Sequence, residues 1–186
     1  IDPGNKAIAM SYDVHCDMVE QKIKLIEINT NAAFLFLSES LYKANEVPPP
    51  IPEFRIKQLI QCFEEEIQLS VAKKSRTLYE PRRVAVIDEL PEQQRLYIEF
   101  LFVKNFLQFH GWDCEIFDYR EINLKNWDFI YNRYTDFYLN RPESKPLRDC
   151  FSSHEKTFSP NPFEYFVLAD KQRMIDWHQD EFWNFS

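Results

Sequence analysis

The chain has 186 residues, of which 45% are hydrophobic and 16% aromatic, and this composition is typical of a globular protein with one good-sized core or two small ones. Its net charge of −8 argues against nucleic acid or an anionic membrane surface as a partner. The sequence has no apolar run near the ~20 residues that a membrane-spanning helix requires, and no secretory signal, so we expect a cytoplasmic protein.

Two residue types exclude further classes of site. The four cysteines are widely spaced and match no metal-ligand pattern, so we expect reduced thiols, with a pair of disulfides as the alternative. Only two glycines occur, Gly4 and Gly111. A phosphate-binding loop or a dinucleotide fingerprint needs several closely spaced glycines. The chain can therefore build neither of them, which also argues against an oxidoreductase of the Rossmann type.

The first part of the chain begins with two strands. Residues 7–15 and 23–29 predict a hairpin around a polar turn at 17–22. Residues 31–44 predict a loop that leads into a short helix, and the prolines between 48 and 52 mark a boundary. A helix follows, with apolar residues at helical spacing from Ile56 to Ile67.

An acidic triplet, Glu64 to Glu66, lies in that helix. Consecutive helical residues point about 100° apart, so three in a row cannot converge on one metal ion. The triplet therefore predicts a solvated helix face.

The pattern then changes to alternating strands and helices. Residues 83–88 are a continuous apolar run of the kind that is buried in a parallel sheet. A helix over about 92–110 follows, with Gly111 at its end as a left-handed cap, and then strands at 112–117 and 127–132. This order predicts an α/β fold with a small open parallel sheet, Rossmann-like and flanked by helices. After a turn at 160–162, residues 163–178 predict a final amphipathic helix.

The sharpest local signal for chemistry is the strand segment Lys24 to Asn31. Alternate residues of a strand share a face, so Glu27 and Asn29 project the same way, while Ile26 and Ile28 project into a core. A carboxylate beside an amide oxygen suits Mg²⁺, which usually needs substrate phosphates to complete its shell. A strand with one solvated face is the alternative interpretation of a bare Glu-x-Asn pair.

Several short motifs carry a resemblance to a known family. Glu27-Ile28-Asn29-Thr30 at the end of an apolar strand resembles the magnesium-binding element of ATP-grasp ligases. Its early position, before a separate α/β part, resembles the circularly permuted branch, typified by eukaryotic-type glutathione synthetase and its bacterial relatives. The stretches 84–95, 129–138 and 159–172 resemble, in the same order, this branch's substrate-domain strand and helix start, its strand-then-loop element, and the segment that re-enters the ATP-grasp part.

The resemblance implies roles for particular residues near the nucleotide. Glu27 and Asn29 would be Mg²⁺ ligands that bridge to ATP phosphates, and Asp13 on the neighbouring strand would support the same site. Lys171 would approach a nucleotide phosphate as a point charge, with an ordinary surface lysine as the alternative.

It also implies roles in substrate binding. Arg133 would clamp a substrate carboxylate through its planar fork, with a pairing to Asp136 as a loop brace as the alternative. Glu89 and Gln94 would contact a small amino-acid or peptide-like substrate.

The resemblance implies an ATP-dependent carboxylate–amine ligase that uses ATP and Mg²⁺. Residues 1–80 would be the N-terminal part of an incomplete ATP-grasp domain, 81–160 the substrate-binding (pre-ATP-grasp) domain, and 161–186 a helix that re-enters the ATP-grasp domain. We expect the chain to be an inactive piece that needs the remainder of that domain, with a homodimer as a further option. A non-catalytic interaction or scaffold domain that uses aromatic-rich surfaces is the alternative function. The aromatic residues that suggest such surfaces are Tyr131, Tyr134, Phe137, Tyr138, Phe182, Trp183 and Phe185.

The sequence also departs from the glutathione synthetase pattern. Asn31-Ala32-Ala33-Phe34 stands where that family carries small hydroxyl residues, and Ser11 and Tyr12 stand where an arginine is expected. These differences predict a substrate other than γ-glutamylcysteine.

Overall fold

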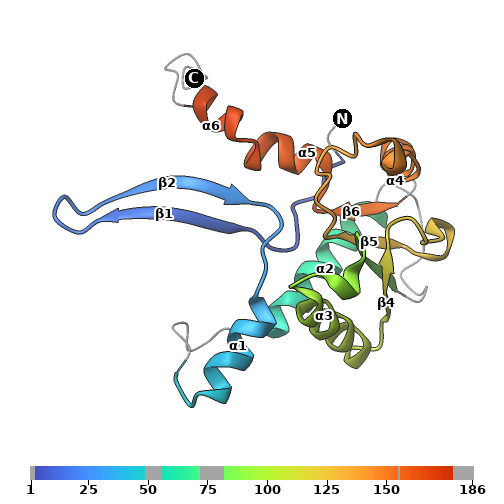
Figure 1. Ribbon diagram of the computed structural model, residues 1–186, viewed down its shortest axis with the longest axis horizontal. Coiled ribbons are helices and arrows are strands. Elements are labelled where there is room, and N and C mark those ends of the chain that lie inside the picture. The colour runs from blue at the N-terminus through green and yellow to red at the C-terminus, as the bar shows by residue number, and fades with distance from the viewer. Residues whose placement is uncertain (1–2, 49–55, 72–81, 155, 178–186) are drawn as a thin grey trace.

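The structure, a computed structural model, describes residues 3–48, 56–71, 82–154 and 156–177. It is a mixed α/β fold in which a four-stranded parallel sheet is flanked by helices, and an antiparallel hairpin extends from this body (Figure 1). The hairpin strands are β1 (Ser11–Asp17) and β2 (Lys22–Asn29). The sheet strands are β3 (Arg83–Asp88), β4 (Asp113–Asp118), β5 (Phe129–Asn132) and β6 (Thr157–Ser159).

Six α-helices accompany these strands within the described ranges: α1 (Leu35–Ala44), α2 (Ile56–Val71), α3 (Tyr97–Phe109), α4 (Lys145–Ser152), α5 (Pro162–Glu164) and α6 (Lys171–Trp177). Shorter turns of 3-10 helix cover Pro91–Gln93, Leu124–Asn126 and Pro142–Ser144, and a π-helical turn covers Tyr165–Ala169. None of the described helices is long and apolar enough to cross a membrane.

The strand order in the parallel sheet is β4-β3-β5-β6. The chain runs from β3 through α3 to β4, and then returns past β3 to β5, so the order reverses between β3 and β5. In open α/β sheets, ligands bind in the crevice outside the carboxyl ends of strands at such a reversal. The fold therefore directs attention to the residues that follow β3 and β5.

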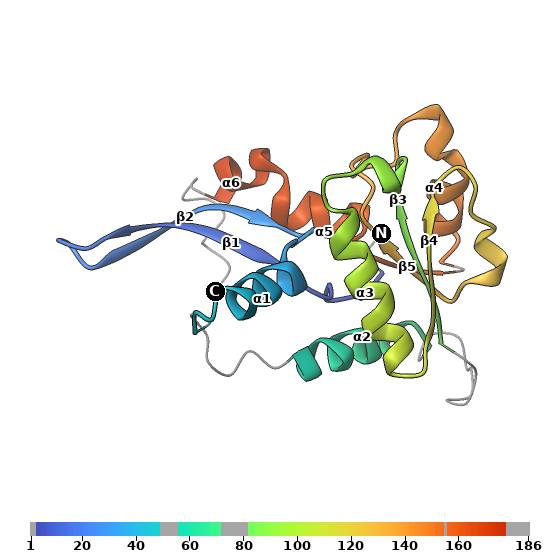
Figure 2. The same cartoon turned by 60° about the horizontal axis from the view of Figure 1, so that its bottom comes forward.

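Each face of the sheet has its own hydrophobic core, because alternate residues of β3 point to opposite faces. Val84 and Val86 pack in one cluster with Phe63 of α2 and Phe100 of α3. Ala85 and Ile87 pack in a second cluster that includes Leu147 and Cys150 of α4. Figure 2 shows α2 and α3 on one side of the sheet and α4 on the other. Both faces are thus covered, as the continuous apolar run at 83–88 predicted.

The described residues give the hairpin no such cover along most of its length. Ile28 is 6% exposed and packs where β2 meets the body, whereas Ile26 is 58% exposed. The prediction that Ile26 projects into a core is therefore wrong, because the hairpin leaves the body at that point. A bulge lies between Asp13 and Val14, so that Asp13 pairs with Glu27 and Val14 pairs with Leu25.

Other predictions from periodicity have mixed outcomes. All four cysteines are free thiols, and Gly111 has a φ of +79° just past α3, so both expectations are confirmed. The predicted helix at 163–178 is interrupted at Asp170, which has an extended backbone between the π-helical turn and α6. The helix α4 and the three-residue strand β6 were not predicted.

The prediction of a solvated acidic triplet is wrong for one of its members. Glu66 is only 2% exposed, while Glu65 is exposed and Glu64 forms an ion pair with Arg82 at 2.7 Å. Glu66 lies on the face of α2 where the N-terminal segment packs, and its carboxyl oxygens accept hydrogen bonds from that segment. A helical face that is acidic in sequence can therefore be buried when a neighbouring backbone needs acceptors.

Candidate functional site

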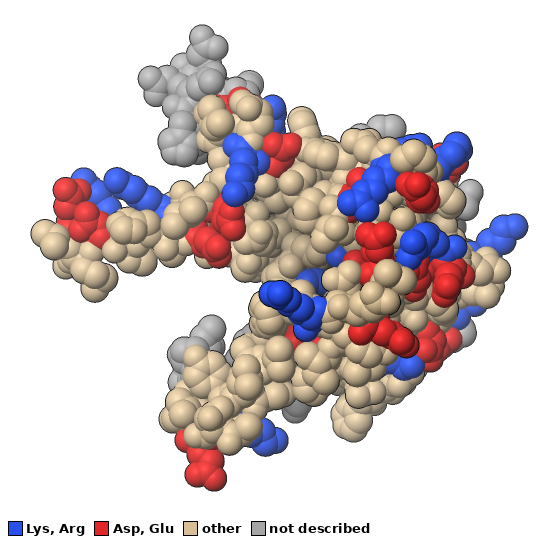
Figure 3. All heavy atoms as spheres, in the orientation of Figure 1, with Lys and Arg blue, Asp and Glu red and all other residues tan. Residues whose placement is uncertain are grey.

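A cavity of about 410 Å³ lies between the body end of β2 and the segment that precedes α6. Glu27, Asn29 and Asn31 line one wall, and Phe137, Tyr165 and Lys171 line the other. Figure 3 shows basic and acidic side chains meeting where α6 approaches the hairpin. The fold thus brings together residues that are far apart in the sequence, including Glu27, Asn29 and Lys171, all three of which the resemblance had assigned to the nucleotide.

Charge and hydrogen bonding are concentrated on Glu27. Lys171 Nζ lies 3.2 Å from Glu27 Oε2, and Asn29 Nδ2 donates to Glu27 Oε1 over 3.4 Å. Asp13 is the cross-strand partner of Glu27, and its side chain also interacts with the Glu27 carboxyl. The hydrogen bond from Lys171, followed by that from Asn29, holds the pKa of Glu27 below its usual value. The Glu27 carboxyl is therefore ionised at neutral pH.

The interruption at Asp170 orients Lys171. The hydroxyl of Tyr138 donates a hydrogen bond to Asp170 Oδ2, and Asp170 Oδ1 accepts the backbone N–H of Gln172 at 2.9 Å. Burial, and then the bond to Asp170, raise the pKa of Tyr138 to about 12, so the phenol keeps its proton as the donor. Asp170 therefore ends one helical segment and caps the next, and Lys171 follows directly at the cavity.

An aromatic pair forms part of the wall opposite β2. The rings of Phe137 and Tyr165 stack with centroids 4.4 Å apart and an interplanar angle of 8°. Such a pair supplies a flat apolar surface beside the charged wall. Sequence reasoning had noted Phe137 only as one of many aromatics, and had not identified Tyr165 or Asp170. The interruption at Asp170, which creates this wall, has no signal in the helical periodicity.

Arg133 does not line the cavity, but it binds the segment that forms one of the cavity walls. It is 5% exposed, and its guanidinium donates to the carbonyls of Ala32 (2.9 Å) and Asn31 (3.3 Å). It also lies over the ring of Tyr131, 5.4 Å from the centroid. Among the described residues, Arg133 does not pair with Asp136, so the loop-brace alternative is not observed. Arg133 holds the segment that follows β2, and its role as a substrate clamp stays a prediction.

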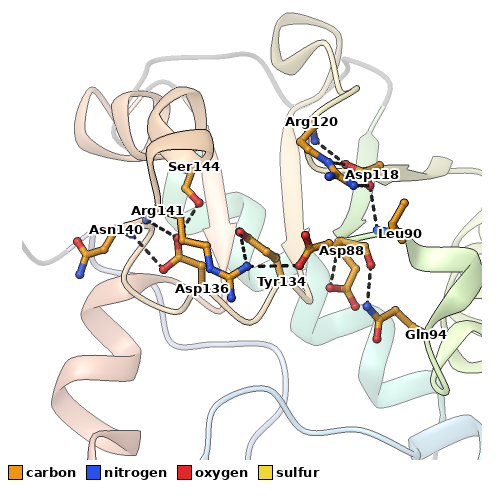
Figure 4. A network of polar contacts seen from close by, with 11 residues as sticks. Asp88, Leu90, Gln94, Asp118, Arg120, Tyr134, Asp136, Asn140, Arg141 and Ser144 are labelled. Atoms are coloured by element: carbon orange, nitrogen blue, oxygen red, sulfur yellow. Dashed lines mark hydrogen bonds and ion pairs between the residues drawn. The ribbon is translucent and has the colours of Figure 1, made fainter.

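A second polar cluster lies at the carboxyl ends of β3 and β5, where the strand order reverses (Figure 4). Glu89 pairs with Arg141 at 3.3 Å, and Arg141 also donates to the hydroxyl of Tyr134 at 3.3 Å. Gln94 Nε2 donates to the backbone carbonyl of Glu89 at 2.6 Å, so Gln94 fixes the turn after β3. The structure brings Glu89 and Gln94 together, and their contact with a substrate stays a prediction. Arg141 had not been identified, because it lies in a loop outside the resembling stretch.

Two buried carboxyl groups lie beside this cluster. Asp88 is 6% exposed, and burial raises its pKa to about 6 in spite of a hydrogen bond from the Glu89 amide at 2.7 Å. Arg120 holds the pKa of Asp118 well below its usual range, and Asp118 Oδ2 accepts the Leu90 amide at 2.8 Å. Near pH 5 Asp88 is therefore largely protonated while Asp118 is ionised, although the two residues are paired at the ends of the neighbouring strands β3 and β4.

Asp136 organises the loop that carries Arg141. Its carboxyl oxygens accept hydrogen bonds from the backbone N–H groups of Asn140 (3.0 Å) and Arg141 (2.9 Å) and from the Ser144 hydroxyl (2.6 Å). The same loop contributes Phe137 to the cavity and Tyr134 to the second cluster. Residues 133–141 therefore connect the two polar sites.

The donor set at Glu27 fits a magnesium ion only in part. Glu27, Asn29 and Asp13 are oxygen ligands, which Mg²⁺ prefers, and Lys171 shows that the carboxylate already attracts a cation. The nitrogen of the Asn29 amide, however, faces Glu27, so the amide must turn before its oxygen can bind the same ion. Within the described ranges, no group of three or more His, Cys, Asp or Glu side chains could hold a metal. The described residues of this site therefore do not enclose a metal ion by themselves.

Comparisons with known proteins do not extend this picture. No family model matches the sequence, and neither a curated protein nor a solved structure matches the chain. The chemistry of the site therefore rests on its own residues, which are an ionised carboxylate, an amide, a lysine and an aromatic wall around one cavity.

Proposed function

We propose that this chain is part of a cytoplasmic ATP-dependent carboxylate–amine ligase of the ATP-grasp type, in which the cavity beside β2 receives the phosphates of Mg-ATP. The observation that carries the proposal is the meeting of Glu27 and Asn29 with Lys171 at one cavity. Carboxylate and amide oxygens on one side and a lysine on the other are complementary to a metal–triphosphate, which is itself both cationic and anionic.

In this proposal each residue has a limited task. Mg²⁺ bound with the nucleotide would offset the charge that develops on the transferred phosphoryl group. Glu27, Asn29 and Asp13 would supply oxygen ligands, and Lys171 would move from Glu27 to a phosphate oxygen. Arg133 would keep the segment after β2 in place through the Asn31 and Ala32 carbonyls. The acceptor substrate, an amino-acid or peptide-like molecule, would lie at the Glu89 cluster.

The test is a calorimetric titration of the full-length protein with Mg-ATP. We expect Glu27→Gln to weaken binding by about tenfold or more, because the charged metal ligand is lost while the shape is kept. Glu20→Gln is the matched control, since Glu20 is on the same hairpin in an exposed pair with Lys22 at 2.8 Å. Equal affinities in the wild type and Glu27→Gln would refute the proposal.

The 186-residue chain alone should show no ATP turnover, because it has only two glycines and no loop that can cradle phosphates. ATP hydrolysis by the purified chain, retained after removal of trace contaminants and lost in Glu27→Gln, would contradict this expectation. The assay separates an incomplete nucleotide site from a complete one.

The exposed hairpin supports a second candidate, a non-catalytic interaction domain. Met18, Val19 and Ile23 are 84%, 93% and 73% exposed, which is a large apolar surface for an isolated strand pair. Of the aromatics that had suggested such a surface, Tyr131 and Tyr134 are buried, and Phe182, Trp183 and Phe185 lie outside the described residues. A full-length protein that binds no nucleotide, yet loses a protein partner on Ile23→Glu, would favour this candidate.

A further inference from the structure

The N-terminal segment that leads into β1 is held by side chains from elements distant in the sequence. Asn5 Nδ2 donates to Glu66 Oε2 at 2.8 Å, and the backbone N–H of Lys6 donates to Glu66 Oε1 at 2.6 Å. The backbone N–H of Ala7 faces the Glu164 carboxyl, and that of Ile8 donates to Ser159 Oγ at 3.2 Å. Asn5, Lys6 and Ile8 therefore donate hydrogen bonds to acceptors from α2 and β6, and Ala7 between them faces a carboxyl of α5.

Two of these acceptors are carboxyl groups withdrawn from water. Glu66 is 2% exposed and Glu164 is 4% exposed. Glu164 Oε2 accepts the N–H of Asn161 at 3.2 Å in a capping box, but Oε1 is buried without a hydrogen-bond partner among the described residues. An ionised carboxylate with an unsatisfied buried oxygen is costly, whereas a carboxylic acid at that position is not charged.

The surroundings assign the two carboxyls different protonation states. Glu66 accepts two N–H donors and has Lys6 nearby, although burial still raises its pKa. Burial, and then the charge of Glu66, raise the pKa of Glu164 to about 8. The charged groups that face this pair are Lys6 from the N-terminal segment and Glu65 from α2. The arrangement therefore favours one charge and one proton in the pair.

We propose that Glu66 and Glu164 form a site for a single proton, carried by Glu164, and that this proton holds the N-terminal segment, and with it the start of β1, against the body. When Glu164 releases the proton to solvent, two buried carboxylates border the same segment, and their repulsion and desolvation favour its detachment. This proposal does not depend on nucleotide binding at the cavity.

The direction of the pH effect follows from linkage. Glu164 in the attached state has a raised pKa of about 8, while in a detached, solvated state it returns towards an ordinary glutamate value. The attached state therefore binds more protons, and attachment weakens as pH rises through the interval between the two values. Above pH 8 both states are ionised, and the dependence levels off.

Amide hydrogen exchange of Lys6 and Ile8, followed by NMR, tests the proposal. After correction for the base-catalysed intrinsic rate, we expect protection of these amides to fall by up to about tenfold per pH unit between pH 5 and 8, and then to reach a plateau. Glu164→Gln should remove most of this pH dependence, because the amide is neutral at every pH and only the smaller contribution of Glu66 remains. A flat profile in the wild type, or an unchanged profile in Glu164→Gln, would overturn the proposal.

Two further variants locate the effect. Glu66→Gln removes the neighbouring charge and should shift the start of the plateau to lower pH, whereas Glu92→Gln, an exposed change on another element, should leave the profile as in the wild type. A Glu66→Gln profile identical to that of the wild type would contradict the pairing. Infrared spectroscopy of the wild type needs no variant. It should show a buried carboxylic-acid band at pH 7 that disappears by about pH 9, and its absence would equally overturn the proposal.

Discussion

The parallel sheet and the hairpin are built from similar β-forming residues but stand in opposite environments. In β3, the four residues from Val84 to Ile87 are all 0% exposed, whereas in the hairpin Val19 and Ile23 are 93% and 73% exposed. An isolated two-stranded hairpin is at best marginally stable in water. The sheet therefore stabilises the molecule through burial, while the hairpin depends for its own stability on its attachment to the body. Glu27 and Asn29 nevertheless lie on the hairpin. The charged site therefore lies on an element that contributes little to the core.

Replacing a buried aromatic should show the largest difference between the two regions. Phe63→Ala should lower the free energy of unfolding by about 3–5 kcal/mol, because Phe63 is 1% exposed and packs on Trp112, Phe129 and Tyr131. Ile23→Ala on the hairpin should change it by no more than about 0.5 kcal/mol. Urea unfolding of both variants measures this contrast, and equal losses would mean that the hairpin is covered in solution.

A smaller effect is expected where α3 supports the helix that follows the hairpin. Glu99 is 5% exposed, and its carboxyl oxygens accept the backbone N–H groups of Phe36 (2.9 Å) and Leu37 (2.8 Å) at the start of α1. Glu99→Ala leaves these amides without an acceptor and should cost about 1–3 kcal/mol. Hydrogen exchange should increase mainly in α1. Exposed Glu92 provides the control, and exchange that increases uniformly would argue against a local cap.

The smallest effect on stability should come from the ion pair between the hairpin and α6. Lys171 is largely exposed, so Lys171→Met should leave the melting temperature nearly unchanged. The pKa of Glu27 should nevertheless rise towards its ordinary value, because Lys171 is the main cause of its lowering. A carbon-detected NMR titration measures this shift. Lys22→Met, at the hairpin tip, should leave the Glu27 pKa as it is, and a similar shift in both variants would show that the Lys171 contact is not maintained in solution.

Much of the fold could be predicted because its signals are local. The apolar run at 83–88, the helical spacing in α2 and the glycine after α3 each act within a few residues. Strand β6 has only three residues, and it is defined by its pairing with β5, which no local pattern encodes. The interruption at Asp170 likewise depends on a hydrogen bond from Tyr138, a partner 32 positions earlier.

The candidate site divides in the same way. The alternation in β2 correctly predicted that Glu27 and Asn29 share a face, since side-chain direction in a strand is a local property. The burial of Glu66 and the carbonyl contacts of Arg133 could not be predicted, because their partners are backbone groups brought near by tertiary packing. The spacing of residues in a sequence does not indicate which polar side chains will bind backbone groups of distant segments.

The bulge in the hairpin sets a limit on how its length can change. On the body side of the bulge, Asp13 stays opposite Glu27; at the bulge β2 has one extra residue, Ile26, and beyond it the strands pair residue for residue from Val14 and Leu25. Removing one residue from each strand beyond that point would shorten the arm and leave the carboxyl pair aligned. Removing a single residue on the body side would turn Glu27 away from Lys171. The turn at the hairpin tip can therefore be lengthened or shortened, whereas a change in length where the hairpin joins the body would misplace Glu27.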